Sequence, residues 1–251
     1  MKADLVAEDI MLDFSTGVDL SFEEVMTEKK LDALRAKMLD EDPTLLTNNF
    51  QSKIPKILNS DLFKCLYKMP KPGIHHLHMT ATVSVQFLLE LTYDWRVYFS
   101  ERENLFKVSA DPNFQKEGYM KVNTLRQYWK NAIEFDEYLM EKMRLRPHTT
   151  HREDHKIWES FQHKFSLTFE LYNYKHFFIK CLYRAMKEYI REMSTIVEIR
   201  HVFGCLFDDN GPVSLAEEIK IFTDMQRNIQ NFVPLFQIRL ISVGLKIFGR
   251  Q

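Results

Sequence analysis

The sequence contains few residues that stabilise a fold by covalent links or tight turns. Its 251 residues include only 3 cysteines, Cys65, Cys181 and Cys205, and 7 glycines. Three widely spaced cysteines with no C-x-x-C pair exclude a disulfide framework and a thiolate zinc finger. The scarcity of glycine, together with 20 phenylalanines, favours long helices with heavy side chains over a turn-rich all-β fold. We therefore expect packing to stabilise the protein.

An excess of charge is also absent, because 34 Lys and Arg stand against 35 Asp and Glu, for a net charge of -1. This balance provides no bulk attraction to nucleic acid or to an anionic membrane. No run of about 18 apolar residues is available for a transmembrane helix. Acidic residues interrupt the short apolar runs near Met1, so a secretory signal is not expected. From the sequence as written we expect a soluble protein without nucleic-acid or membrane partners.

The first recognisable segments predict a helical N-terminal extension over residues 1–68. Ser21-Phe22-Glu23-Glu24 is a capping box, and apolar positions follow it at helical spacing as far as Pro43. They predict an amphipathic helix with one buried face, available to another subunit. A second helix is expected from about Ser52 to Tyr67, because Pro70-Lys71-Pro72-Gly73 then breaks the pattern.

Three short segments, near residues 73–79, 195–201 and 237–243, predict strands. Helices are expected between them, near residues 86–91, over residues 154–193 with a break near Asn173, and from the capping box at Ser214 to about Phe232. Residues 94–150 are polar and irregular, with helical spacing over 124–143, and indicate a mainly helical insertion.

Alternating strands and helices are typical of parallel β/α units, and a closed barrel needs eight strands. We therefore expect an α/β fold, a partial (β/α) TIM-type barrel of about three strands. Residues 69–93 supply the first barrel strand and helix, and 94–150 the insertion. Residues 151–251 supply the barrel helices and strands two and three, where the barrel is truncated. Such an open sheet is expected to expose a hydrophobic edge and face.

Two histidines of the first strand are candidate metal ligands. Side chains two apart in a strand lie on the same face, so His76 and His78 can present two imidazoles to one metal at the mouth of a barrel. H-x-H by itself is a weak signal, and the alternative is a structural pair on a half-exposed strand. Their place at a strand end favours the metal site, because barrel enzymes carry their ligands there.

The stretch from Met69 to His78, M-P-K-P-G-I-H-H-L-H, resembles the first-strand motif of the adenosine deaminase family. It is most similar to the adenosine deaminase growth factor branch, the extracellular type, where M-P-K-G precedes H-x-H. Residues 62–68 resemble the end of that branch's dimer-forming extension, and residues 94–148 occupy the place of its insertion domain. Further similar segments are Glu134-Phe135-Asp136, residues 157–161 and residues 196–200. The resemblance covers nearly the whole chain, as the N-terminal portion of the family's sequence.

The resemblance implies a zinc-dependent adenosine deaminase, a hydrolase in which zinc-activated water attacks the purine ring and displaces ammonia. A metal-bound water has its pKa lowered toward about 7. By resemblance His76 and His78 are two zinc ligands, and Trp158 lines the nucleoside pocket with its neighbours Glu159 and His163. The alternative for Trp158 is a helix core residue. The implied partners are adenosine or a related purine nucleoside, and a second copy of the chain bound through the N-terminal helices.

The chain departs from the family pattern at several positions. Met79 and Thr80 follow H-x-H where the family usually has an acidic residue, and residues 243–246 lack a histidine that the branch often has there. The later zinc histidine, the H-A-G-E glutamate, the next catalytic histidine and the final aspartates have no counterpart. We therefore assign no catalytic residue, and zinc has two of the three protein ligands of a usual catalytic site. Deamination by this chain alone is not expected.

Other histidines offer alternatives. His148, His151 and His155 form a cluster with Asp154 that can be drawn as a metal site on a helix, but it follows Pro147 in a polar stretch, which favours a solvated loop. His201 follows the second strand, where it can face the barrel mouth.

Three hypotheses remain. The first is an enzyme, a zinc adenosine deaminase of which this chain is the N-terminal part. The second is a catalytically inactive protein that acts in binding or dimerisation. The third is an unrelated helical protein with an accidental H-x-H, which the ordered motif matches disfavour. Localisation stays open: the branch is mostly secreted, with a signal peptide and a disulfide in the insertion, whereas residues 94–150 contain no cysteine. An intracellular relative and a chain truncated at both ends would each account for this.

Overall fold

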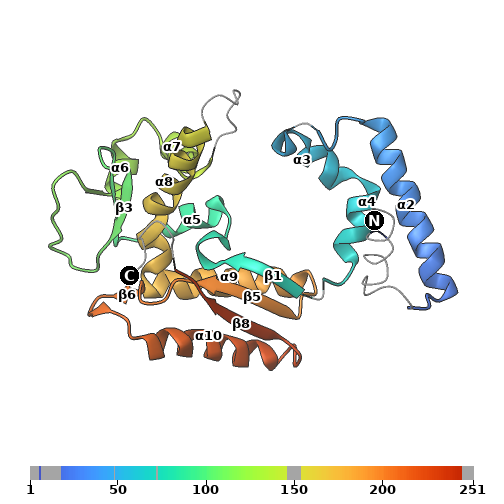
Figure 1. The fold of residues 1–251 in the computed structure, drawn as a ribbon. Coiled ribbons are helices and arrows are strands. Elements are labelled where there is room, and N and C mark those ends of the chain that lie inside the picture. The colour runs from blue at the N-terminus through green and yellow to red at the C-terminus, as the bar shows by residue number, and fades with distance from the viewer. Residues whose placement is uncertain (1–5, 7–17, 48, 72, 146–153, 245–251) are drawn as a thin grey trace. The chain divides into compact units, whose positions relative to one another are not determined.

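The computed structural model describes residues 6, 18–47, 49–71, 73–145 and 154–244, without the side chains of residues 154–156. The chain divides into two compact units, Met1–Met69 and Pro70–Gln251. Figure 1 labels the elements of both units, and each unit is described by itself below. None of the helices in the described ranges is both long enough and apolar enough to cross a membrane.

The first helix of the N-terminal unit is α2, Phe22–Glu41. The capping box at its start is confirmed: the Glu24 amide donates to Ser21 Oγ at 3.2 Å, and the Ser21 amide donates to the Glu24 carboxylate at 2.8 Å. The helix ends two residues before Pro43, as expected. The prediction that one face of this helix is buried is met only in part, because α2 has no fully buried residue. Its predicted apolar positions are half-buried: Val25, Leu31, Leu34, Met38 and Leu39.

The predicted single helix over residues 52–67 is wrong, because two helices occupy this stretch. They are α3, Phe50–Asn59, and α4, Asp61–Lys68. Ser60 separates them: its backbone is extended, and its hydroxyl accepts the amide proton of Phe63 at 3.1 Å to cap α4.

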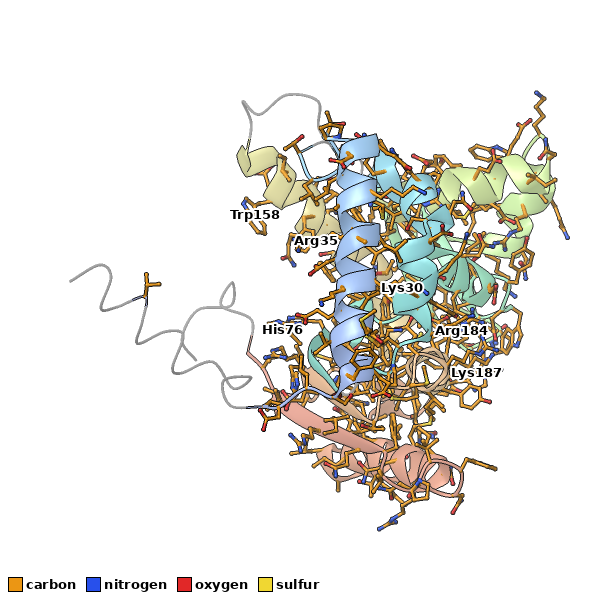
Figure 2. The ribbon with its side chains drawn as sticks, turned by 90° about the vertical axis from the view of Figure 1, so that its right-hand side faces the viewer. Lys30, Arg35, His76, Trp158, Arg184 and Lys187 are labelled. Carbon is orange, nitrogen blue, oxygen red and sulfur yellow. The ribbon has the colours of Figure 1, made fainter. Side chains whose placement is uncertain are left out.

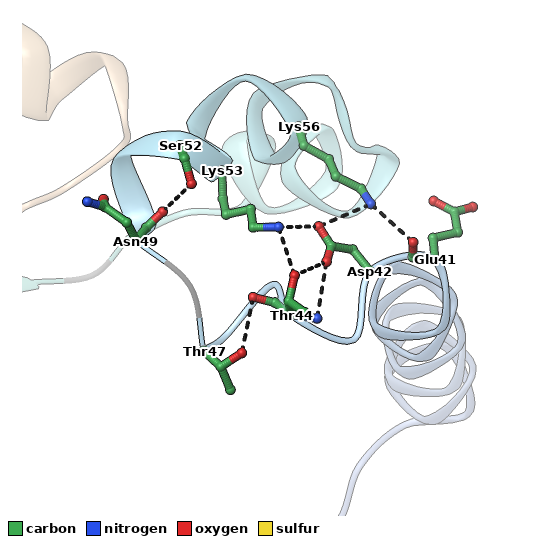
Figure 3. A network of polar contacts seen from close by, with 8 residues as sticks. All are labelled: Glu41, Asp42, Thr44, Thr47, Asn49, Ser52, Lys53 and Lys56. Carbon is green, nitrogen blue, oxygen red and sulfur yellow. Dashed lines mark hydrogen bonds and ion pairs between the residues drawn. The ribbon is translucent and has the colours of Figure 1, made fainter. Parts of the chain in front are cut away.

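A polar network joins the end of α2 to α3 (Figure 3). Lys53 Nζ lies 2.7 Å from Asp42 Oδ2, and the Thr44 hydroxyl donates to Asp42 Oδ1 at 2.6 Å. These hydrogen bonds, that of Lys53 above all, hold the pKa of Asp42 far below its usual range. Asp42 is therefore ionised at neutral pH and holds the loop between the two helices.

The C-terminal unit is built around a parallel sheet of three strands. They are β1, Gly73–His78; β5, Ile196–His201; and β8, Gln237–Ser242, in the order β1-β5-β8. The three predicted strands and their parallel arrangement are confirmed. The helices between them are α5, Val85–Leu91; α8, Asp154–Asn173; α9, Lys175–Arg191; and α10, Leu215–Gln230. The predicted break near Asn173 and the cap at Ser214 are also present. The fold is mixed α/β.

The two faces of this sheet differ in chemistry. Val197 and Ile199 of β5 are fully buried in a core that includes Leu171, Phe178 and Phe222 of α8, α9 and α10. Figure 1 shows α10 running alongside β8. The residues that alternate with them in β5, Glu198 and Arg200, are only half-buried. Strand β5 sends Glu198 and Arg200 to the uncovered face. The exposure of a hydrophobic edge and face by the whole sheet stays a prediction.

The described part of the predicted insertion, residues 94–145, holds the expected helices and also a sheet that was not expected. Its helices are α6, Val122–Tyr128, and α7, Ala132–Met143. Before them, β2, Val97–Ser100, pairs antiparallel with both β3, Leu105–Val108, and β4, Met120–Lys121. All four residues of β2 are buried, so the alternation that marks a strand is missing. The aromatics that look scattered in the sequence form its core, as in the contact of Phe99 with Phe106.

Candidate functional site

The carboxyl ends of the three parallel strands meet at one edge of the sheet, where His78 ends β1, His201 ends β5 and Ser242 ends β8. Parallel α/β folds bind ligands at this edge. His76 and His78 are both exposed here. Their Nε2 atoms are 3.3 Å apart and their ring centroids 5.3 Å apart. The two imidazoles therefore point at a common position.

This separation suits chelation of one metal ion. Two ligand nitrogens at about 2.0–2.1 Å from a tetrahedral zinc ion are about 3.3 Å apart. The same distance also fits an N–H···N hydrogen bond between the rings in the metal-free protein. In the described ranges no set of three or more His, Cys, Asp or Glu is arranged to hold a metal. Within the described ranges the arrangement therefore offers two imidazoles, and metal binding by His76 and His78 stays a prediction.

The electrostatic surroundings favour the form of His78 that binds a metal. Partial burial lowers the pKa of His78, and the nearby His76 and Arg200 lower it further. His78 is therefore neutral at physiological pH. A neutral imidazole is the ligating form, because a protonated ring has no lone pair to donate.

Charged side chains of β5 lie beside the first strand, and one of them also contacts β8. Arg200 Nη1 donates a hydrogen bond to the carbonyl of His75 at 2.9 Å. Glu198 lies 3.7 Å from His75 Nδ1 and 3.4 Å from Arg239 Nη1. The sequence interpretation mentioned Glu198 and Arg200 only as part of a strand motif. Their alternation with buried Val197 and Ile199 is the signal that identifies them as open-face residues.

The predicted nucleoside-pocket residues lie on α8 (Figure 2). Trp158 is 68% exposed and meets Phe161 edge to face. Its alternative role as a helix core residue is wrong. Glu159 is exposed as well. His163 Nε2 accepts from Asn104 Nδ2 at 2.6 Å, which ties it to the turn between β2 and β3. Figure 2 labels Trp158 and His76, which stand apart in that view. A role for the three α8 residues in nucleoside binding stays a prediction.

The prediction that His201 can face the barrel mouth is wrong. His201 is only 4% exposed and lies on the core face, among Phe178, Phe203 and Phe222. Its position follows the period of β5, which places residue 201 on the same face as the buried residues 197 and 199.

His201 has a buried carboxylate partner that the sequence did not reveal. Its Nε2 lies 3.1 Å from Oε2 of Glu218, which has no exposed surface. The Glu218 carboxylate also accepts the amide protons of Gly204 at 3.0 Å and Leu206 at 3.4 Å. It therefore joins α10 to the loop after β5.

The remaining sequence candidates lie either outside the described residues or at positions that the structure explains by packing. His148 and His151, and the side chains of Asp154 and His155, lie outside the described residues. Met79 is buried in the core, so its position after H-x-H serves packing. Burial raises the pKa of Cys205, which keeps this thiol protonated at neutral pH.

The neutral state of His201 predicts a pH dependence of stability. Burial lowers its pKa below the ordinary 6.5 more than its hydrogen bond to Glu218 raises it. Below pH 6.5 the unfolded chain therefore binds more protons than the folded chain, and the free energy of unfolding falls as the pH falls. Urea unfolding at pH 7.5 and pH 5.5 is expected to show this loss, by at most about 1.4 kcal/mol per pH unit.

A His201→Gln variant, whose amide can still donate to Glu218, serves as the control. Other histidines, such as the exposed His176, also have pKa values lowered by partial burial and contribute in the same direction. The variant is therefore expected to reduce the pH-dependent loss without abolishing it. An unchanged pH dependence would contradict the assignment to His201.

Comparisons with known proteins support the adenosine deaminase family at low identity. No protein-family model matches the chain. It is 24% identical over 237 residues to an adenosine deaminase of Phlebotomus duboscqi, covering 84% of this chain and 44% of the relative. It is 26% identical over 213 residues to adenosine deaminase 2-A of Danio rerio, covering 78% and 41%. With human adenosine deaminase 2 it shares 26% identity over 262 residues, covering 98% and 50%. The chain spans about half the length of the curated relatives it matches.

Proposed function

We propose that this chain is the N-terminal part of a zinc-dependent adenosine deaminase, which converts adenosine and water to inosine and ammonia. His76 and His78 are two of its zinc ligands. The observation that carries the proposal is the 3.3 Å separation of their Nε2 atoms at the carboxyl edge of a parallel sheet. The similarity to curated adenosine deaminases supports the substrate, and the three β/α units support a partial TIM-type barrel.

Each group has a distinct part in this proposal. Bound zinc supplies activation of water at neutral pH. His76 and His78 hold the metal as neutral imidazoles, and the remaining ligands come from outside the described residues. The exposed indole of Trp158 offers a flat face for a purine base, since bases stack on aromatic side chains. Glu159 and His163 lie on the same helix, where they can contact the polar edge of a nucleoside.

The N-terminal unit, in this proposal, is the dimerisation element of the growth factor branch. Its helices leave large apolar side chains exposed, notably Phe22, Met26 and Phe50. The described residues of the N-terminal unit do not bury these side chains. A homodimer formed through residues 1–68 would remove them from water, which is the usual reason for such a surface.

A catalytically inactive protein that acts in binding or dimerisation is the second candidate. Two observations favour it. No third metal ligand joins the two histidines within the described ranges. Met79, at the position where the family usually has an acidic residue, is buried and packs in the core.

Formation of inosine from adenosine by the purified chain with one equivalent of zinc tests the proposal. If the chain is a deaminase with further ligands outside the described residues, inosine forms, and the His76→Ala/His78→Ala variant forms none. Zinc bound through the two histidines without inosine supports the metal site and is expected both for the N-terminal part of a deaminase and for the inactive candidate. A chain that binds no zinc at either residue contradicts both the metal site and the proposed enzyme.

A further inference from the structure

Strand β1 does not pair with β5 residue for residue. Ile74 is opposite Val197, but the next partner on the same face of the sheet is Leu77, opposite Ile199. Three steps along β1 therefore match two steps along β5. One extra residue is inserted in β1 at His75 and His76, which makes this a β-bulge.

The bulge decides which face the two histidines occupy. If the register of Gly73 and Ile74 continued without it, His76 would stand opposite Ile199 and His78 opposite His201. Both of those β5 residues lie on the core face and are buried. Residues that pair across a sheet point to the same face, so a shift of one residue moves a side chain to the other side. The regular register would send both histidines into the core.

With the extra residue the pattern reverses. Leu77 takes the position beside Ile199, where an apolar side chain packs, and His78 stands beside Arg200 on the open face. His76, within the bulge, is also exposed, with its Nε2 3.3 Å from that of His78. The bulge therefore brings the two imidazoles together on the open face.

A side-chain hydrogen bond from Arg200 reaches the bulge. A bulge disrupts the ladder of backbone hydrogen bonds and leaves a residue without its regular partner. Arg200 Nη1 donates to the carbonyl of His75, in the bulge, at 2.9 Å. A carbonyl that accepts a hydrogen bond from a charged donor is stabilised more than one bonded to a neutral donor.

We propose that Arg200 is a positioning residue for the metal pair: by binding the His75 carbonyl it stabilises the bulge that holds His76 and His78 together on the open face. This inference rests on the proposed function, in which His76 and His78 bind a metal ion. Arg200 itself does not contact the metal.

Charge and position predict opposite effects at this site. A guanidinium beside a dication repels it, so loss of Arg200 would strengthen metal binding if only its charge mattered. Loss of a positioning hydrogen bond weakens binding, and removal of such an outer partner of a metal ligand costs about 10- to 100-fold in affinity. The sign of the change therefore separates the two roles.

The test uses Cu²⁺ held by iminodiacetate, since this complex keeps coordination positions open for imidazole nitrogens. It requires only the two histidines, and its nitrogen couplings are visible by electron paramagnetic resonance. Titration of the full chain gives the affinity, and the His76→Ala/His78→Ala variant gives the background from other histidines. Arg200→Met is expected to bind about 10- to 100-fold more weakly and to lose the two-nitrogen signal.

Two variants control for charge and folding. Arg239→Met removes the same charge from the same face without a contact to the His75 carbonyl, and it is expected to bind within about twofold of the wild type. Arg200→Lys keeps a charged donor, and its affinity for the copper complex is expected to lie between those of the wild type and Arg200→Met. If the methionine variant does not fold, the lysine variant is used in its place.

Two outcomes contradict different parts of the account. Equal or tighter binding by a folded Arg200 variant would overturn the positioning role and leave the metal site intact. Wild-type binding no stronger than that of the double-histidine variant would overturn the metal site, and the positioning role with it.

Discussion

Replacing Glu218 with alanine is expected to destabilise the C-terminal unit by about 3–5 kcal/mol, because each buried donor that loses its acceptor costs about 1–3 kcal/mol. The carboxylate has no exposed surface and is bonded to His201 and to the amides of Gly204 and Leu206. Alanine leaves the buried His201 ring and the buried Leu206 amide without this acceptor, whereas water can reach the exposed Gly204. Urea denaturation at pH 7.5 measures the loss.

The adjacent residue gives a matched control. Glu217 is on the same turn of α10 and pairs with Lys175, but its side chain is 44% exposed. Glu217→Ala is therefore expected to cost less than about 1 kcal/mol, as exposed ion pairs do. Equal losses for the two alanine variants would show that burial of the Glu218 network does not stabilise the fold.

Replacement of either His76 or His78 with alanine is expected to lower zinc affinity by more than 100-fold. Each change removes one of the two ligands that the described residues supply, and a direct ligand contributes more than the outer partners whose loss costs about 10- to 100-fold. Competition with a chromophoric zinc chelator gives the affinity of each variant.

His75 is the matched control for this prediction. It is the third histidine of β1, it is exposed, and its ring lies 3.7 Å from Glu198. His75→Ala keeps the backbone carbonyl that Arg200 binds, so zinc affinity is expected to stay within about threefold of the wild type. A loss as large as that of His76→Ala would mean that the ligand pair has been assigned incorrectly.

Local sequence signals predicted the elements that depend on local chemistry. Capping hydroxyls at Ser21 and Ser214 marked the starts of α2 and α10, and the β-branched run in residues 195–200 marked β5. The break at Ser60 was missed because the apolar spacing continues across it. Strand β2 was missed because all four of its residues are buried, and a short continuous apolar run does not distinguish a strand from a helix.

The candidate site was predictable only in part. The i, i+2 spacing correctly places His76 and His78 together, yet the face they occupy depends on a bulge, which is a property of pairing with a distant strand. The His201–Glu218 pair joins residues 17 apart through tertiary packing, so no spacing rule indicates it. Contacts of this kind form between elements and leave no local pattern.

X-ray absorption at the zinc edge tests the central claim most directly, on the full chain loaded with one equivalent of zinc. Two imidazole nitrogens are expected at about 2.0–2.1 Å in the zinc shell, and they are expected to be lost in the His76→Ala/His78→Ala variant. A zinc shell without imidazole, or one that is unchanged in the double variant, would contradict the claim that these two histidines form a metal site.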